Sequence, residues 1–305
     1  MGSRGFRFKP DSYCGKNDSM TTVAYHLYQP KRQTTAVVFS SPHSGRDYPQ
    51  AFLDSSVLDE RRLRSSEDAF VDDLFAAAVD NGAPLLAASA PRAYVDLNRS
   101  ADDLDPAVVR GVAANRTNAR VASGLGVIPR VVAEGRAIRS GKITYAEAVE
   151  RLEAFYHPYH RQLRALISDC HAQFGSALLI DCHSMPSEAL SNHVGSSATR
   201  PQVILGDRFG ATCDKRYVDQ IEGFFRQEGF SVMRNSPFAG AFITQFYGRP
   251  ALGQHAVQIE IDRSLYMNEH LVRPNGNFAA FQTLLSSVVA DITRIGRRSL
   301  SLAAE

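Results

Sequence analysis

Two histidines follow apolar runs that are typical of buried strands. His43 follows residues 36–39 (AVVF) in the sequence SSPHSG, and His183 follows residues 177–180 (ALLI) in the sequence DCHS. In open α/β sheets, functional side chains gather beyond the carboxyl ends of the strands. A neutral imidazole there can bind a metal ion, so both histidines are candidate ligands, although a histidine in a turn can also bond to backbone alone.

Acidic and thiol side chains accompany these histidines. Asp181 lies two residues before His183, so the two share one face of a strand and one can support the other as a ligand. Glu260 interrupts the apolar end of another strand, where a carboxylate either pairs with a cation such as Arg263 or works as an acid and base. We favour the second role. Cys182 suggests a thiol nucleophile, but adjacent strand residues point to opposite faces, which disfavours it.

Polar residues that could bind a substrate form two further groups. Asn98 and Arg99 are expected at the end of a short strand, where the guanidinium could bind a carboxylate or an oxyanion, or form a structural salt bridge. Residues 235–244 (NSPFAGAFIT), followed by YGR at 247–249, predict either a shaped loop that exposes backbone N–H groups or an ordinary loop and hairpin.

Strand and helix patterns alternate along the chain, which predicts an α/β sheet covered on both faces. Strands are expected at residues 36–39, 84–88, 177–180, 202–205 and 256–261. Helices are expected at residues 67–80, 144–175, 214–228 and 278–297. The second of these begins with a capping box, Thr144 with Glu147, and Pro158 should kink or break it. Residues 100–142 show weak periodicity and could form short helices or a lid.

Composition excludes several classes of protein. The chain has 305 residues with 34 basic and 32 acidic side chains, so no strong field recruits nucleic acid or a membrane surface. The apolar stretch 278–292 carries too many polar residues to span a bilayer. Four cysteines without a CxxC pattern favour reduced thiols in a cytoplasmic protein. No GxSxG, P-loop, dinucleotide or HExxH motif is present.

The chain is expected to form one domain. Residues 1–20 have no apolar core of a secretory signal and are interpreted as a flexible N-terminal tail. Residues 21–305 contain no linker, repeat or break in composition, and they are therefore expected to fold as a single catalytic domain.

In order and spacing, the quoted motifs resemble the N-formylglutamate amidohydrolase family. The resemblance runs from His43 to Met267 through SPHSGRDYP, EDAFVDDLF, DLNR, FYHPYH, LLIDCHS, VILGD, NSPFAGAFIT, YGRP and QIEIDRSLYMNE. It implies the three-layer α/β sandwich of zinc carboxypeptidases, in which helices cover both faces of a mixed, mostly parallel sheet. It also implies Zn²⁺ or another divalent cation at the strand ends.

The resemblance further implies roles for individual residues. His43 and His183 match two metal ligands, and Glu260 matches the catalytic base. The wider group places a glutamate ligand three residues after the first histidine, where this chain has Arg46. The carboxylate ligand is therefore expected to be Asp68, with Glu67 as the fallback.

The implied reaction is hydrolysis of N-formyl-L-glutamate to formate and L-glutamate, in histidine breakdown. Arg99, with Asn98, is the first choice to bind this small-molecule substrate, and Arg99 could also face the oxyanion. Arg46, Arg249 and Arg263 compete for the second carboxylate, while Gly240 and Tyr247 belong to the candidate binding loop. Three alternatives stay open: a metal amidase for another N-acyl amino acid or small peptide, a cysteine amidase, and a non-catalytic amino-acid-binding protein.

Overall fold

The computed structural model describes residues 11–14, 23–113, 118–190 and 200–297. Its centre is a sheet in which eight strands are ordered β1-β2-β4-β3-β5-β8-β6-β7 over these described residues. The strands are β1 (Asp11–Cys14), β2 (Val23–Tyr28), β3 (Val37–Ser41), β4 (Leu85–Ala88), β5 (Ala177–Met185), β6 (Val203–Gly206), β7 (Val232–Arg234) and β8 (Gln254–Asp262). The pairs β3–β4, β3–β5, β5–β8 and β6–β7 are parallel, and the other three are antiparallel. The predicted mixed, mostly parallel sheet is confirmed.

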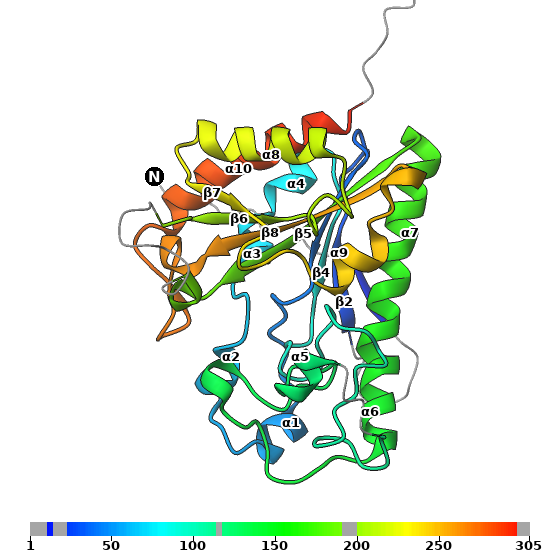
Figure 1. The fold of residues 1–305 in the computed structure, drawn as a ribbon, viewed down its shortest axis with the longest axis vertical. Helices are drawn as coiled ribbons and strands as arrows, with labels where there is room; N and C mark the ends of the chain where they lie inside the picture. The colour runs from blue at the N-terminus through cyan, green and yellow to red at the C-terminus, as the bar shows by residue number, and fades with distance from the viewer. Residues whose placement is uncertain (1–10, 15–22, 114–117, 191–199, 298–305) are drawn as a thin grey trace, which may run out of the picture.

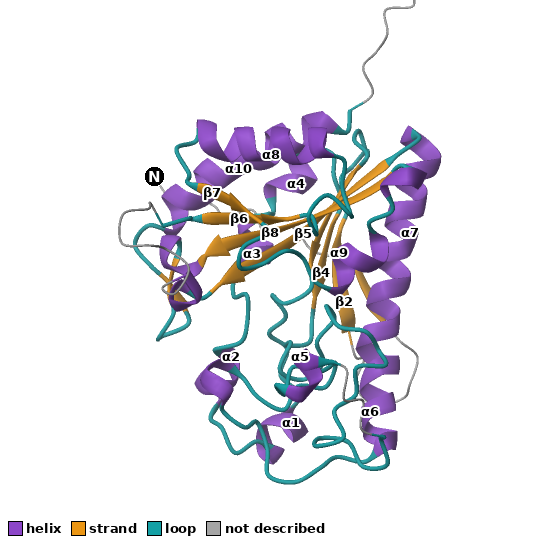
Figure 2. Ribbon diagram, viewed as in Figure 1, coloured by secondary structure: helices purple, strands orange, loops and turns teal. Residues whose placement is uncertain are grey.

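Helices cover both faces of this sheet, as Figures 1 and 2 show. One face carries α8 (Lys215–Gln227) and α10 (Phe278–Ile295), with the short α3 (Val71–Leu74) and α4 (Ala77–Asp80). The other face carries α7 (His157–Phe174), which contacts β2, β3 and β5, and α9 (Phe242–Tyr247), which contacts β5 and β8. The expected three-layer sandwich is therefore confirmed.

A hydrophobic core lies on each face of the sheet, and the side chains of each strand point alternately into one core and the other. On β3, Val37 and Phe39 pack into the core under α8 and α10, whereas Val38 packs into the core under α7. On β5, Leu178, Ile180 and Cys182 join the first core and Leu179 the second. Because side chains alternate, Asp181 and His183 lie on the same face of the sheet as Leu179.

Short elements and long loops lie below the sheet in Figure 2. They include α1 (Gln50–Ser55), α2 (Glu60–Arg64), α5 (Ala119–Ala122) and α6 (Tyr145–Arg151). A separate two-stranded ribbon pairs β9 (Met267–Asn268) with β10 (Arg273–Pro274). Single helical turns occur at Ala133–Gly135, Ser187–Leu190, Pro250–Leu252 and Arg263–Leu265. No helix in the described ranges is both long and apolar enough to cross a membrane.

Local structure departs from the expected elements in two helical regions. The helix expected at 67–80 is instead α3 and α4, because Phe70 has a left-handed φ of 67° that a continuous helix does not allow. A kink or break was expected at Pro158. The interruption of the regular helix lies before this residue, where a π-helical segment, Leu152–Tyr156, separates α6 from α7. Pro158 itself lies in the first turn of α7, where its missing N–H is not needed.

Loop regions also differ from expectation. Asn98 and Arg99 lie in a segment of turns rather than at the end of a strand. Residues 235–241 form a loop that leads into α9, so the hairpin alternative for this region is wrong. Within the segment expected to be a tail, Asp11–Cys14 pairs with β2 as a strand; at these four residues the structure differs from that expectation.

Candidate active site

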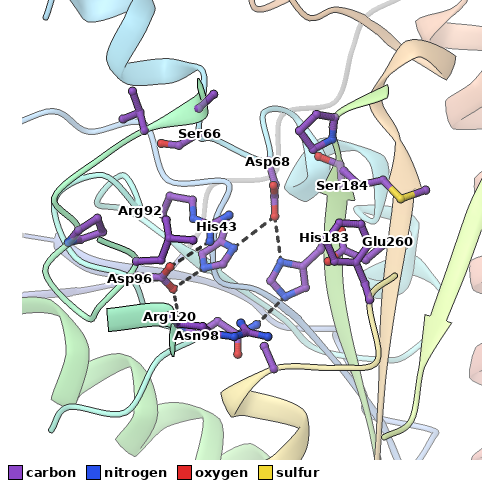
Figure 3. Close-up of a pocket in the computed structure, with 18 of the residues that line it drawn as sticks. His43, Ser66, Asp68, Arg92, Asp96, Asn98, Arg120, His183, Ser184 and Glu260 are labelled. Atoms are coloured by element: carbon purple, nitrogen blue, oxygen red, sulfur yellow. Dashed lines mark hydrogen bonds and ion pairs between the residues drawn. The ribbon is translucent and has the colours of Figure 1, made fainter. Parts of the chain in front are cut away.

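Three buried side chains converge at the carboxyl ends of neighbouring strands. His43 lies in the turn after β3, His183 lies near the end of β5, and Asp68 precedes α3. One potential ligand atom from each lies within 4.8 Å of the others. The Nδ1 atoms of His43 and His183 face the same oxygen, Asp68 Oδ2, at 3.4 and 2.9 Å. Figure 3 shows Asp68 between the two imidazoles.

The opposite nitrogen of each imidazole meets a carboxylate. His43 Nε2 lies 2.7 Å from Asp96 Oδ1, and His183 Nε2 lies 3.0 Å from Asp181 Oδ2. Asp96 also accepts hydrogen bonds from Arg92 at 3.0 Å and from the Asn98 backbone N–H at 2.9 Å. Such carboxylates fix the orientation of ligating histidines, so both Nδ1 atoms are held toward Asp68.

This cluster fits a divalent cation. His43 Nδ1 is buried and has no hydrogen-bond partner among the described residues, although two carboxylates lie beside its ring. Burial works against ionisation of Asp68, but the two imidazoles beside it, His183 and His43, hold the pKa of that carboxyl well below its usual value. Two imidazoles and an ionised carboxylate form a donor set that zinc commonly takes, with room for water as a further ligand.

Glu260 adds a second buried carboxyl group to the site. It lies on β8 directly across from His183 on β5, and Figure 3 shows the two side chains next to each other. Gln258 Nε2 donates a 2.6 Å hydrogen bond to Glu260 Oε1. Burial raises the pKa of Glu260 to about 7; the His183 charge opposes this rise, and the Asp68 charge adds to it. A carboxyl group with this pKa can exchange protons near neutral pH.

Arg263 does not neutralise Glu260. Its guanidinium donates instead to Asp68 Oδ1 at 2.9 Å and to Ser184 Oγ at 3.2 Å. Glu260 has no ion-pair partner in the part of the chain that the structure describes. The described residues therefore lack the structural ion pair that was the alternative interpretation of Glu260. Arg263 lines the catalytic cavity, but its guanidinium is engaged by Asp68 and Ser184.

Asn98 and Arg99 border the site, but the protein engages most of their polar atoms. Asn98 Oδ1 accepts from the Ile243 N–H at 2.7 Å, and its Nδ2 lies 3.0 Å from His183 Nε2. Arg99 Nε donates to the Leu125 carbonyl at 2.9 Å, and Nη1 donates to the Asn98 carbonyl at 2.7 Å. Arg99 Nη2 lies 3.7 Å from Asp96 Oδ2.

The remaining predicted substrate-binding residues do not gather at one place. Gly240 lines the cavity beside the cluster of His43, Asp68 and His183, and Arg249 lines a second, adjacent cavity. Arg46 lines neither cavity; it forms ion pairs with Asp72 at 3.0 Å and Asp73 at 3.5 Å. Tyr247 is buried behind the site, with its hydroxyl 3.0 Å from His160 Nδ1.

Two other residues also turn away from the site. Glu67, the fallback ligand, accepts hydrogen bonds from Arg64 and Tyr48 and does not join the cluster. Cys182 is buried in the apolar core on the opposite face of β5, and burial raises the pKa of its thiol. These contacts give Cys182 no access to a substrate at His183.

The catalytic cavity has a volume of about 450 Å³ and contains residues that motif analysis did not single out for function. Asp96 stands within the quoted DLNR motif, so its position was available as a signal. Arg92 and Arg120 also line the cavity. Arg120 comes from the short helix α5 in the weakly periodic region 100–142, where no pattern in the sequence marks it.

Comparisons with known proteins show the family to which this chain is related. The model of the N-formylglutamate amidohydrolase family matches residues 35–267. N-formylglutamate deformylase of Pseudomonas aeruginosa is 33% identical over 242 residues, which cover 78% of this chain and 85% of the relative. The Pseudomonas putida protein of the same name is 34% identical over 236 residues, 76% of this chain and 82% of the relative.

A solved structure extends the match to the fold. The crystal structure of N-formylglutamate amidohydrolase from Ralstonia eutropha JMP134 superposes with a TM-score of 0.84 at 36% identity. The match covers 90% of this chain and 99% of that one. The matched segment contains His43, Asp68, His183 and Glu260. From the family match, the relatives and the shared fold, we conclude that this chain belongs to the N-formylglutamate amidohydrolase family.

Proposed function

We propose that this protein hydrolyses N-formyl-L-glutamate to formate and L-glutamate with the help of a divalent cation, for which zinc is our choice. The observation that carries the proposal is the convergence of His43, Asp68 and His183 beside a buried glutamate, in a chain of this family. Relatives named N-formylglutamate deformylase support the choice of substrate.

His43, Asp68 and His183 would hold the cation, and Asp96 and Asp181 would orient the two histidines. The bound cation supplies a Lewis acid that polarises the formyl oxygen and brings the pKa of water to about 7. Burial of the three ligands matters because charges interact more strongly where water is excluded.

Glu260 would carry the proton during the reaction. It accepts a proton from the attacking water as the new C–O bond forms at the formyl carbon. It then delivers that proton to the departing nitrogen as the C–N bond breaks, so that L-glutamate leaves as a neutral amine. A pKa of about 7 suits both transfers, because neither form of the carboxyl group is strongly favoured at neutral pH.

Arg99 would supply positive charge for the substrate's α-carboxylate or for the developing oxyanion. Its Nε and Nη1 are fixed by backbone carbonyls, so its guanidinium is preorganised at the wall of the cavity. Asn98 would act mainly as a positioning residue, since its amide connects His183 to the start of α9.

Formate release from N-formyl-L-glutamate tests this proposal. We expect purified protein to release formate, to lose that activity when a chelator removes the metal, and to regain it on addition of zinc. A thiol-blocking reagent should leave activity unchanged, because Cys182 is buried away from the cavity. N-acetyl-L-glutamate and formylated neutral amino acids serve as the comparison substrates.

Three outcomes would contradict the proposal. No formate release under any metal condition would reject the named substrate. Activity that persists after metal analysis has shown complete removal would reject the cation. Faster hydrolysis of another N-acyl amino acid would assign the chain to a different substrate within the same reaction class.

A further inference from the structure

A second cavity adjoins the catalytic one. It has a volume of about 780 Å³ and shares part of its wall with the catalytic cavity, namely Asn98, Arg99, Arg120 and Ala241. Beyond this shared wall it is bounded by the segment after β6 and by α9. A molecule bound at the metal cluster could therefore extend past Arg120 into the second cavity.

The wall of the second cavity is strongly basic. Arg99, Arg120, Arg208 and Arg249 line it, whereas Asp103 is the one carboxylate among its lining residues. Over the described ranges, Arg120, Arg208 and Arg249 form no ion pair with a carboxylate. Outside those ranges the sequence has two acidic residues, Asp18 and Glu305. Among the described residues, these three arginines of one cavity therefore have no carboxylate at ion-pair distance, and a single aspartate shares their wall.

Asp103 is hydrogen-bonded to neutral groups and forms no ion pair with Arg120, Arg208 or Arg249. Its Oδ1 accepts a 2.6 Å hydrogen bond from Asn118 Nδ2, and its Oδ2 accepts from the Ser100 backbone N–H at 3.3 Å. These contacts fasten the loop that leads to α5 and hold Asp103 to that loop. Because arginines outnumber this one carboxylate in the wall, the cavity keeps a net positive charge that favours an anionic ligand.

Arg208 is held in the wall by a specific backbone conformation. Arg208 and Phe209 both have left-handed φ values, 51° and 58°, which cost energy in residues other than glycine. Asn235 Oδ1 stabilises this turn by accepting hydrogen bonds from the N–H groups of Asp207 and Phe209. The Arg208 N–H donates to the Ala239 carbonyl at 2.7 Å, and its Nη1 donates to the Gly240 carbonyl at 3.4 Å.

Arg120 lies in the part of the wall that the two cavities share. It lies on α5, and Figure 3 labels it among the residues that line the catalytic cavity. Burial, together with the nearby charges of Arg92 and Arg120, lowers the pKa of Arg99, while Asp96 opposes this effect. Like charges held this close are unfavourable unless an anion joins them.

We infer that the second cavity binds the side-chain carboxylate of the substrate through Arg120 and Arg208, and so selects acidic N-acyl amino acids over neutral ones. This inference rests on the proposed function for the position of the formyl group. Neither arginine appeared among the sequence candidates for the second carboxylate. Of those candidates, Arg46 and Arg263 are engaged by other carboxylates.

Kinetics of Arg120→Gln and Arg208→Gln on two nearly isosteric substrates test the inference. With N-formyl-L-glutamate, we expect each variant to raise KM about 10- to 100-fold, the range for loss of a charge-assisted hydrogen bond, with a smaller change in kcat. With N-formyl-L-glutamine, we expect kcat/KM to stay within about threefold of wild type, because the neutral amide makes no ion pair. Arg161→Gln, an exposed substitution on α7, is the matched control and should behave as wild type.

Two results would overturn the inference. Equal losses on the glutamate and glutamine substrates would indicate a general structural or catalytic effect. Unchanged KM values in both variants would show that the side-chain carboxylate binds elsewhere.

Binding of L-glutamate and L-glutamine, measured by calorimetry on the zinc-loaded proteins, separates this inference from the proposed function. We expect wild type to bind L-glutamate at least about 10-fold more tightly than L-glutamine, and both variants to lose this preference. If formate is never released but this pattern appears, the proposed reaction fails and the inference stands. If wild type shows no preference for L-glutamate, the inference fails whatever the reaction is.

Discussion

Asp68 illustrates how one side chain organises the site. Its Oδ2 faces both imidazoles, while its Oδ1 accepts a 2.9 Å hydrogen bond from Arg263. The protein thereby stabilises an ionised carboxylate in a buried position, where an unpaired charge would be costly. The position that the resemblance associates with a glutamate ligand holds Arg46, whose side chain turns toward Asp72.

At the residue scale, Glu260→Gln should separate chemistry from binding. The amide keeps the size of the side chain but cannot accept the proton of the attacking water. We expect kcat on N-formyl-L-glutamate to fall by about 100-fold or more, in line with the contribution of general acid–base catalysis. Steady-state kinetics with zinc analysis of the same samples provides the measurement.

The exposed Glu150→Gln substitution on α6 is the control, and it should leave kcat unchanged. Zinc content should stay near that of wild type in both variants, since Glu260 is not among the three clustered ligands. A Glu260→Gln enzyme with full turnover would remove Glu260 from the proton transfer.

At the scale of elements, His160 connects three parts of the fold behind the site. It lies on α7, its Nε2 is 2.9 Å from the Leu97 carbonyl, and its Nδ1 is 3.0 Å from the Tyr247 hydroxyl on α9. The segment that contains Leu97 leads directly to Asn98, and α9 follows the loop that contains Gly240. This histidine therefore fixes two walls of the cavity against the longest helix of its face.

His160 should make stability depend on pH. Burial lowers its pKa to about 4, below the ordinary value of 6.5 that applies in the unfolded chain. As the pH falls, the unfolded chain therefore binds a proton at this group before the folded chain does. Neutral His160 makes its full contribution to the free energy of unfolding above pH 6.5, and this contribution declines as the pH falls toward 4. We expect acidification from pH 7.5 to pH 5 to remove about 2 kcal/mol through this group.

Urea unfolding of wild type and His160→Gln at both pH values provides the test. The glutamine does not titrate, so the free energy of unfolding of the variant should fall less on acidification than that of wild type. Identical changes in the two proteins would show that His160 titrates alike in the folded and unfolded chains.

At the scale of the whole molecule, the cluster joins segments that are far apart in the sequence. His43, Asp68, His183 and Glu260 come from four segments, and their side chains meet only when β3, β5 and β8 are paired. A cation held by this cluster binds the folded chain much more tightly than the unfolded chain. Metal binding should consequently stabilise the fold as well as support the reaction.

Thermal unfolding with and without zinc tests this coupling. At a free zinc concentration of about 100 times Kd, we expect about 2.7 kcal/mol of added stability and a Tm higher by several degrees. Asp68→Asn should largely abolish the shift, because it removes the charged ligand. His270→Gln, which alters an exposed histidine outside the cluster, should retain it. An equal shift in the Asp68 variant would place the stabilising zinc elsewhere.

The sequence by itself determined the strands that hold the site and the residues at their ends. Apolar runs bounded by turn residues predicted β3, β5 and β8, and alternation placed His183 and Asp181 on one face with Cys182 on the other. These inferences succeeded because a strand has a period of two and its ends are marked locally. The order of the family's motifs added the roles that we propose for His43, His183 and Glu260.

Only the tertiary structure decided which loop residues join them. Asp68 reaches the histidines through a turn at Phe70 that breaks the expected helix, while Glu67 and Arg46 turn to other partners. Arg120 and Arg208 line one cavity although 88 positions separate them in the chain. Loop side chains follow no period, and their directions depend on contacts between distant segments, which a linear pattern does not encode.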